Sequence, residues 1–204
     1  MTDTAYRPDP AYARALKIAA AVNAIVFVAE VLVAIQSGSV SLMADAVDFL
    51  EDAILYTVAF AALGASLRMR AATGMATATV MLLPGLYALW LVIRQIVYGV
   101  PPSPIPMGVM GFIALVANVY CTYLLVRHRK GDAAQTGVWL STRNDAFANI
   151  ATILAAVGVA ATQSIWPDVL VGLAIGTLNI WGAWRIFQRA RDEWASSGDP
   201  SNLQ

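Results

Sequence analysis

Four acidic residues fall within eight consecutive positions of a strongly apolar stretch, which reads S-V-S-L-M-A-D-A-V-D-F-L-E-D from Ser39 to Asp52. They are Asp45, Asp48, Glu51 and Asp52. An ionised carboxylate at the centre of a bilayer costs roughly 2.5–3.5 kcal/mol on insertion scales, so such groups face other helices or water rather than lipid. A chain that places four of them together recovers this cost most simply by binding a cation.

The composition around these acids is that of a membrane protein. Of the 204 residues, 59% are hydrophobic and 13% are charged, whereas soluble domains carry about 25% charged residues. The formal net charge is zero, which argues against a nucleic-acid partner. Cys121 is the single cysteine, so an internal disulfide and a cysteine-based metal site are excluded.

Six apolar segments, each near the ~20 residues that a spanning helix needs, predict an all-α integral membrane protein with six transmembrane helices and no soluble domain. We place them at about 13–36, 42–65, 74–98, 106–127, 135–162 and 167–189. We expect a six-helix transmembrane domain at 13–191, between a cytoplasmic N-terminal tail at 1–12 and a short cytoplasmic tail at 192–204.

Basic residues concentrate in alternate connections between these segments. The three other connections contain no lysine or arginine, and only Arg94 and Arg143 depart from the pattern. The positive-inside rule therefore puts both termini in the cytoplasm, and we expect a bacterial inner (plasma) membrane. The basic residues that follow the pattern are Arg7, Arg14, Lys17, Arg68, Arg70, Arg127, Arg129, Lys130, Arg185, Arg189 and Arg191.

Helical periodicity gathers the acids of the second segment on one side. At about 100° per residue, all four project into a sector roughly 120° wide. Asp48 and Asp52 are four residues apart and stack on one face, close enough to share an ion. The fifth segment carries a matching column of oxygen donors in Ser141, Asp145 and Asn149. Placed opposite the second segment, Asp145 would complete a group of three carboxylates.

Two further segments carry polar stripes. Asn23 and Glu30 share a face of the first segment, and Asn118 and Thr122 share a face of the fourth. Intramembrane amides also serve simply to join helices by hydrogen bonding. For the asparagines, this structural role and a functional role are equally well supported. Glu30 has three possible roles, as a proton site, a salt-bridge partner of Arg94 or an acid that packs between helices.

The second segment resembles the signature of the cation diffusion facilitator family, a family of divalent metal/proton antiporters. The resemblance rests on Ser39, Ser41, Leu42, Met43, Ala44, Asp45, Ala46, Val47 and Asp48, followed four residues later by Asp52. In the family, Asp48 corresponds to a His, Asp or Asn. Ser141 and Asp145 resemble the motif of the fifth helix, and the supporting matches are Glu30, Asn118 and Trp166-Pro167-Asp168.

The resemblance implies a homodimer of six-helix protomers that exchanges cytoplasmic divalent metal for protons. The first, second, fourth and fifth helices would enclose the site. The implied metal ligands are Asp48, Asp52, Asp145 and Ser141. Residues around them or along the pathway would be Asp45, Asn149, Glu30, Glu51 and Asn118. We expect no permanently bound cofactor. Zinc is the first choice of cargo, with cadmium, cobalt, iron and manganese as alternatives.

Two departures from the family pattern matter. Ser141 stands where the family has His or Asp, so the site contains no imidazole, and oxygen-only sites suit harder ions such as manganese. The cytoplasmic metal-binding domain that usually follows the sixth helix is expected to be absent, so dimerisation would rest on the transmembrane helices. Two alternatives remain, a non-transporting membrane scaffold or metal sensor, and a proton-coupled carrier of a small organic cation.

Overall fold

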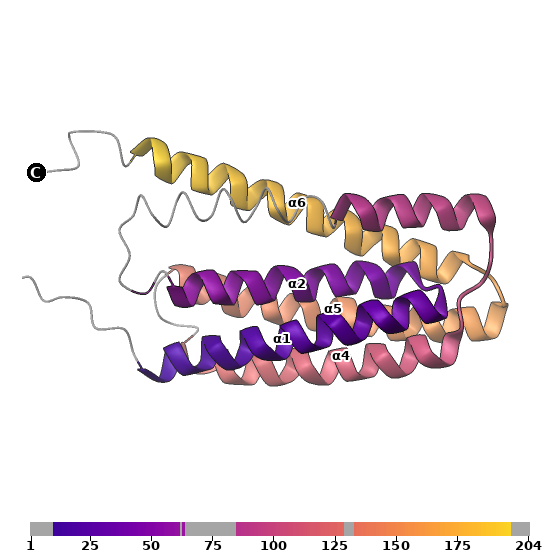
Figure 1. Ribbon diagram of the computed structural model, residues 1–204, viewed down its shortest axis with the longest axis horizontal. Helices are drawn as coiled ribbons and strands as arrows, with labels where there is room; N and C mark the ends of the chain where they lie inside the picture. The colour runs from indigo at the N-terminus through magenta and orange to yellow at the C-terminus, as the bar shows by residue number, and fades with distance from the viewer. Residues whose placement is uncertain (1–9, 62, 64–84, 129–132, 197–204) are drawn as a thin grey trace, which may run out of the picture.

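The structure is a computed structural model that describes residues 10–61, 63, 85–128 and 133–196. These residues form helices and no strand, which confirms the predicted all-α class. The elements are α1 (Pro10–Ser37), α2 (Val40–Ala61), a helix at Gly85–Tyr98, α4 (Pro104–Leu125), the short 3₁₀ helix η1 (Val126–His128), α5 (Ala133–Thr162) and α6 (Trp166–Ser196) (Figure 1).

Three helical stretches are long and apolar enough to cross a membrane, namely Pro10–Ser37, Pro104–Leu125 and Asp145–Thr162. The bounds of α1, α4 and α5 lie within three residues of the predicted segments. The predicted segment at 74–98 is described only from residue 85 onward, and its first part lies outside the described residues.

Helix α6 differs most from the prediction, because it continues to Ser196 instead of ending near residue 189. The added residues include Ala190, Arg191 and Glu193, which favour a helix but are too polar for a hydropathy window to include. The predicted tail at 192–204 therefore begins inside a helix.

The helices α1, α2, α4 and α5 pack together as a bundle, with α1 against α2 and α4, and α5 against α4 and α2. Helix α6 lies along one side of this bundle and contacts α2 and α5. Figure 1 shows the Gly85–Tyr98 helix on the same side, next to α6. The predicted set of four enclosing helices is therefore the set that forms the bundle.

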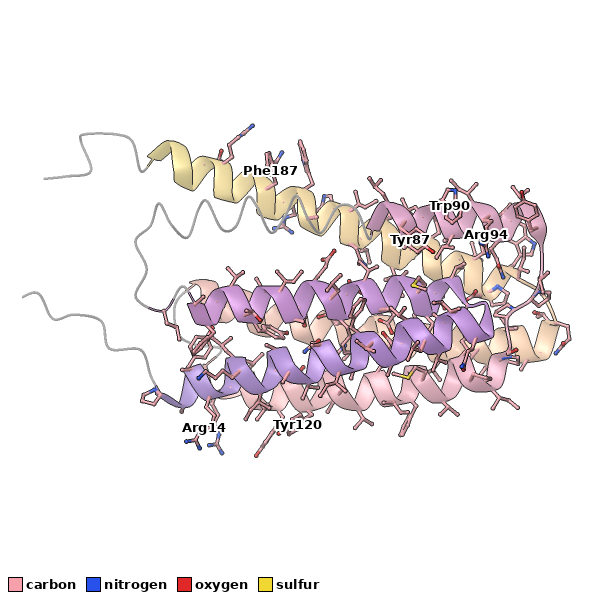
Figure 2. All side chains as sticks on the ribbon, in the orientation of Figure 1. Arg14, Tyr87, Trp90, Arg94, Tyr120 and Phe187 are labelled. Atoms are coloured by element: carbon pink, nitrogen blue, oxygen red, sulfur yellow. The ribbon has the colours of Figure 1, made fainter. Side chains whose placement is uncertain are left out.

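The distribution of side chains is the reverse of that in a soluble protein, with apolar groups outside and many polar groups inside. Large apolar side chains point outward, with Ile25 at 71% and Ile105 at 77% exposure, and Figure 2 shows Tyr120 pointing away from the bundle. A soluble protein seldom exposes an apolar surface this extensive, whereas a bilayer requires one. The buried polar residues are Asn23, Glu30, Ser37, Ser39, Ser41, Asp45, Asp52, Asn118, Asn149, Thr152, Asp168 and Asn179.

Asp168, at the start of α6, holds the start of α2 in place. Its carboxylate accepts hydrogen bonds from the backbone N–H of Val40 at 2.8 Å and of Ser41 at 3.0 Å. It also accepts from the hydroxyls of Ser39 at 2.7 Å and Ser41 at 2.6 Å. First-turn N–H groups of a helix have no partner within the helix, so a carboxylate from α6 supplies the cap.

Two further contacts fix α6 along α2. The side-chain amide of Asn179 donates to the carbonyl oxygen of Ala44 at 3.1 Å. Gly172 lies so close to the α2 backbone that a Cβ there would be 2.9 Å from the nitrogen of Ser41. These contacts place the middle of α6 beside the acidic part of α2.

Candidate metal site

A cavity of about 300 Å³ opens between α2, α5 and α6 beside three of the acidic side chains. Asp48 and Glu51 enter it from α2, and Asp145 enters it from α5. The same cavity is lined by Ala148, Ile175, Leu178, Asn179, Trp181 and Gly182. The predicted pairing of α2 with α5 around carboxylates is therefore present, and α6 supplies a wall that the sequence did not predict.

Asp52 lies deeper in the bundle than Asp48 and is held by its own helix. The hydroxyl of Tyr56, one turn further along α2, donates to its Oδ2. Asp145 is an electrostatic neighbour of both Asp48 and Asp52. The three carboxylates that the sequence grouped are thus brought together by the contact between α2 and α5.

On α5 the backbone around Asp145 is stabilised by the next turn. The side-chain amide of Asn149 donates to the carbonyl oxygen of Asp145 at 2.9 Å, and Asn149 is fully buried. Oδ2 of Asp145 has no hydrogen-bond partner in the described structure. Ser141 lies one turn before Asp145 on α5, and its side chain lies outside the described part of the chain.

Asp45 is an electrostatic neighbour of Glu30 on α1 as well as of Asp145 on α5. It lies against Glu30 of α1, and both side chains are fully buried. No salt bridge joins Glu30 to Arg94 in the described residues, because both Glu30 carboxylate oxygens lack a partner and Arg94 lies over the Trp90 ring. The salt-bridge role that the sequence left open for Glu30 is therefore wrong.

The polar stripes of α1 and α4 meet inside the bundle. Asn23 and Asn118 are both buried, and the Asn23 amide donates to the carbonyl oxygen of Ala19 at 2.8 Å and to Sγ of Cys121 at 3.6 Å. The contact with Cys121 joins α1 to α4, which supports the helix-joining role for Asn23. Asn118 Oδ1 and Thr122 Oγ1 have no described partner.

Buried side-chain atoms without a partner in the described structure are all oxygens. Native proteins leave few buried polar groups unpaired, so a column of them inside a bundle calls for an explanation. Carboxylate and amide oxygens accept hydrogen bonds and bind cations, so this interior is suited to protons or metal ions. The residues concerned are Asn23, Glu30, Asp45, Glu51, Asn118, Thr122, Asp145, Asn149 and Thr152.

The carboxylates are neighbours without forming a closed coordination shell. Among the described residues, no three His, Cys, Asp or Glu side chains are arranged to hold a metal ion. A shared ion would require Asp48, Asp52 and Asp145 to rotate towards one another.

Two features of the site were missed by the sequence analysis. The hydrogen bond from Tyr56 to Asp52 is the first, and the spacing of four residues between them on a helix was a usable signal. The second is the capping of α2 by Asp168. It could not be predicted because the partners of Asp168 lie 127 to 129 positions away in the chain, and no local pattern connects them.

Comparison with known proteins shows the family to which the chain belongs. The family model described as "Cation efflux transmembrane domain" matches residues 16–193. This chain belongs to the cation efflux family, whose members are membrane transporters and not enzymes. The match spans every helix around the candidate site.

A curated relative gives a further comparison. "Zinc transporter ZitB" of Pectobacterium atrosepticum is 25% identical over 197 residues, which cover 89% of this chain and 61% of that protein. The chain thus spans about three fifths of the length of the curated relative that it matches.

Proposed function

We propose that this protein exports a divalent metal cation from the cytoplasm in exchange for protons. Asp48, Asp52 and Asp145 would bind the cation, with Ser141 as a fourth ligand. The observation that carries the proposal is the convergence of acids from α2 and α5 beside one cavity within an apolar bundle. Such acids inside a membrane mark ion pathways and proton relays.

The proposed exchange of metal for protons follows from the negative charge of Asp48, Asp52 and Asp145. Three neighbouring carboxylates repel one another in a medium of low dielectric, and a divalent cation between them removes this repulsion. Metal ligands must be deprotonated, so binding releases protons and protonation releases the metal. Alternating access to the two sides of the membrane would couple inward proton flow to outward metal flow.

Zinc is the first choice of cargo. Carboxylates bind zinc in many proteins, and the curated relative is named a zinc transporter. The proposed ligands contain no imidazole, and carboxylate and hydroxyl ligands also suit manganese. Cadmium, cobalt, iron and manganese are the competing cargoes. We further propose that the functional unit is a homodimer joined through the membrane helices.

The test is metal uptake into proteoliposomes that enclose a pH-sensitive dye. Zinc, cadmium, manganese, iron and cobalt are supplied separately to wild type, Asp48→Asn, Asp145→Asn and Asp192→Asn. The two site variants keep side-chain shape but remove a negative charge, whereas Asp192 is exposed on α6 beside Arg191. We expect metal-dependent proton movement in wild type and Asp192→Asn, and only background flux in the site variants.

Each result separates the alternatives. Metal uptake without proton movement would contradict antiport, and wild-type flux in both site variants would contradict the assignment of the ligands. Transport of a small organic cation by wild type, with no metal flux, would favour the organic-cation carrier.

A non-transporting scaffold or metal sensor is the second candidate function. It is the alternative to transport that the sequence leaves open. Folded wild-type protein that moves none of the five metals in proteoliposomes would support it.

A further inference from the structure

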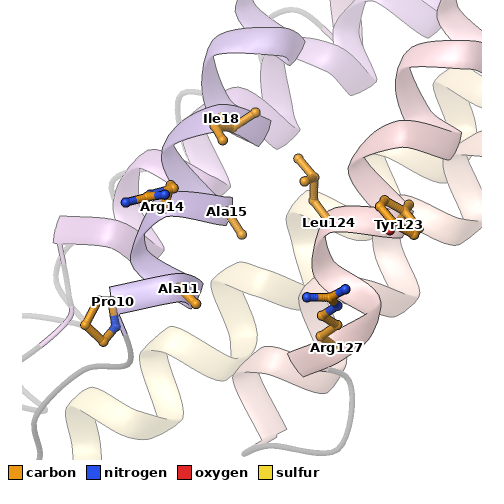
Figure 3. A pocket seen from close by; sticks show the side chains of 8 residues that line it. All are labelled: Pro10, Ala11, Arg14, Ala15, Ile18, Tyr123, Leu124 and Arg127. Carbon is orange, nitrogen blue, oxygen red and sulfur yellow. The ribbon is translucent and has the colours of Figure 1, made fainter.

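A second cavity lies between the start of α1 and the end of α4, and it shares no lining residue with the acidic cavity. Its volume is about 440 Å³. Figure 3 shows Arg14 on α1 and Arg127 on η1 among the side chains that line it. The remaining lining is mostly apolar and consists of Pro10, Ala11, Ala15, Ile18, Tyr123 and Leu124.

The two arginines give this cavity a positive charge that no described group neutralises. No acidic side chain lines it, and within the described residues neither guanidinium forms a salt bridge. Both side chains are exposed. Lys17, the nearest other cation on α1, instead lies 4.4 Å from the centre of the Phe60 ring. Two guanidinium groups on separate helices, with no acidic partner among the described residues, suit a ligand with several anionic oxygens.

The position along the helices matches the level of lipid headgroups. Helix α1 has 28 residues, or roughly 42 Å at 1.5 Å per residue, which exceeds the ~30 Å hydrocarbon core. Arg14 is the fifth residue of α1, and Arg127 follows the last residue of α4 by two positions. Both charges therefore lie near one end of their helices, where a spanning helix meets the lipid headgroups.

An apolar surface continues from the cavity along the outside of α4. Phe112, Val116, Val119, Tyr120 and Tyr123 follow one another at intervals of one to four residues and are all at least 45% exposed. Their spacing places them on the outer side of α4, which Figure 2 illustrates for Tyr120. An acyl chain can lie along this surface while its headgroup occupies the cavity.

We propose that this cavity binds the phosphate-bearing headgroup of an anionic membrane lipid. Arg14 and Arg127 would hold the phosphate oxygens, and the acyl chains would run along α4. Free inorganic phosphate shares the headgroup chemistry but makes no use of the apolar surface, and the cavity opens where lipid surrounds the protein. The inference does not depend on which ion the acidic cluster transports.

The test is native mass spectrometry of the full-length protein in detergent, with added phosphatidylglycerol, phosphatidylcholine or inorganic phosphate and no metal. The variants are Arg14→Ala/Arg127→Ala and, as a matched control, Arg185→Ala, which removes an exposed arginine over the Trp181 ring of α6. We expect phosphatidylglycerol binding to weaken about thirtyfold in the double variant and to stay unchanged in the control.

Several outcomes would overturn the proposal. These are equal retention of phosphatidylcholine, unchanged phosphatidylglycerol binding in the double variant, and displacement of the lipid by low concentrations of inorganic phosphate. If the double variant fails to fold, the single variant Arg127→Ala is tested instead, and we expect its phosphatidylglycerol binding to be about fivefold weaker. Lipid binding is measured without metal, so a failure of metal transport leaves this result interpretable.

Discussion

Each acid of α2 has its own surroundings, although the four residues share one helical sector. Asp45 lies against Glu30 of α1, Asp48 and Glu51 line the cavity near α5 and α6, and Asp52 accepts a hydrogen bond from Tyr56. This division favours distinct roles within one proposed transport cycle. Asp48 and Asp52 can share a cation with Asp145, whereas Asp45 also contacts Glu30 of α1.

Ser141 is the position at which we expect metal preference to be set. Replacing it by His would add an imidazole to an oxygen-only site, and neutral imidazole suits zinc better than manganese. We therefore expect Ser141→His to shift the ratio of zinc to manganese uptake at least about tenfold, with little change in expression. Competition between the two metals in proteoliposomes measures the ratio, and an unchanged ratio would remove Ser141 from the ligands.

Asp168 is expected to matter for stability more than any other described acid. Asp168→Ala removes the acceptor of two backbone N–H groups and two hydroxyls, all of them buried. The loss should be on the order of 3 kcal/mol, because buried donors are left unpaired. Thermal unfolding in detergent measures it, with Asp192→Ala as a control expected to change stability by less than about 0.5 kcal/mol.

At the scale of elements, α6 is the helix that fixes the geometry of α2. It caps the start of α2 through Asp168 and contacts its middle through Asn179. Small residues allow the two backbones to approach closely, as is common between membrane helices. The acids of α2 are positioned by this packing as well as by their own helical spacing.

Gly172 provides a test of the close packing between α6 and α2. A Cβ at this position would lie 2.9 Å from the Ser41 nitrogen and 3.0 Å from the Val40 carbonyl carbon, and backbone atoms cannot yield cheaply. We expect Gly172→Ala to lower stability by about 1–3 kcal/mol. Gly182→Ala on the same helix is the matched control, because its Cβ would meet nothing within 4 Å. Equal unfolding temperatures for the two variants would contradict this account of the interface.

At the scale of the whole molecule, charge is distributed along the long axis of the bundle. Arg14, Lys17 and Arg127 lie at the end where α1 begins and α4 ends. Arg94 lies at the opposite end, where it lines a cavity with Gly38 and Ser39. This distribution is the one that the positive-inside rule associates with a cytoplasmic start of α1.

The predicted orientation is tested by thiol labelling. We expect a cysteine introduced at exposed Arg127 to react with a membrane-impermeant maleimide in inside-out vesicles and not in intact cells. A cysteine at exposed Val100, between the Gly85–Tyr98 helix and α4, should show the reverse. The native Cys121 is buried and serves as an internal background. Reversed accessibility of the two positions would place the basic end outside the cytoplasm.

Much of this architecture was predictable because a bilayer imposes a simple rule on sequence. Lipid accepts only apolar side chains and requires internally satisfied backbones, so helix length and polar periodicity were both visible in the chain. The burial of Asn23, Glu30 and Asn118 confirms their predicted inward stripes. The end of α6 was missed because a helix that leaves the membrane loses the hydropathy signal while it keeps its backbone hydrogen bonds.

The sequence by itself determined the membrane class, the family signature and the face of each helix that turns inward, because these depend on local periodicity and transfer free energy. The tertiary structure alone decided which helix each inward face meets. It placed Asp45 between Glu30 of α1 and Asp145 of α5, and it brought Asp168 to Val40, the first residue of α2, which lies 128 positions earlier in the chain. Such contacts join positions that are distant in the chain, so only the packing of the whole bundle selects them.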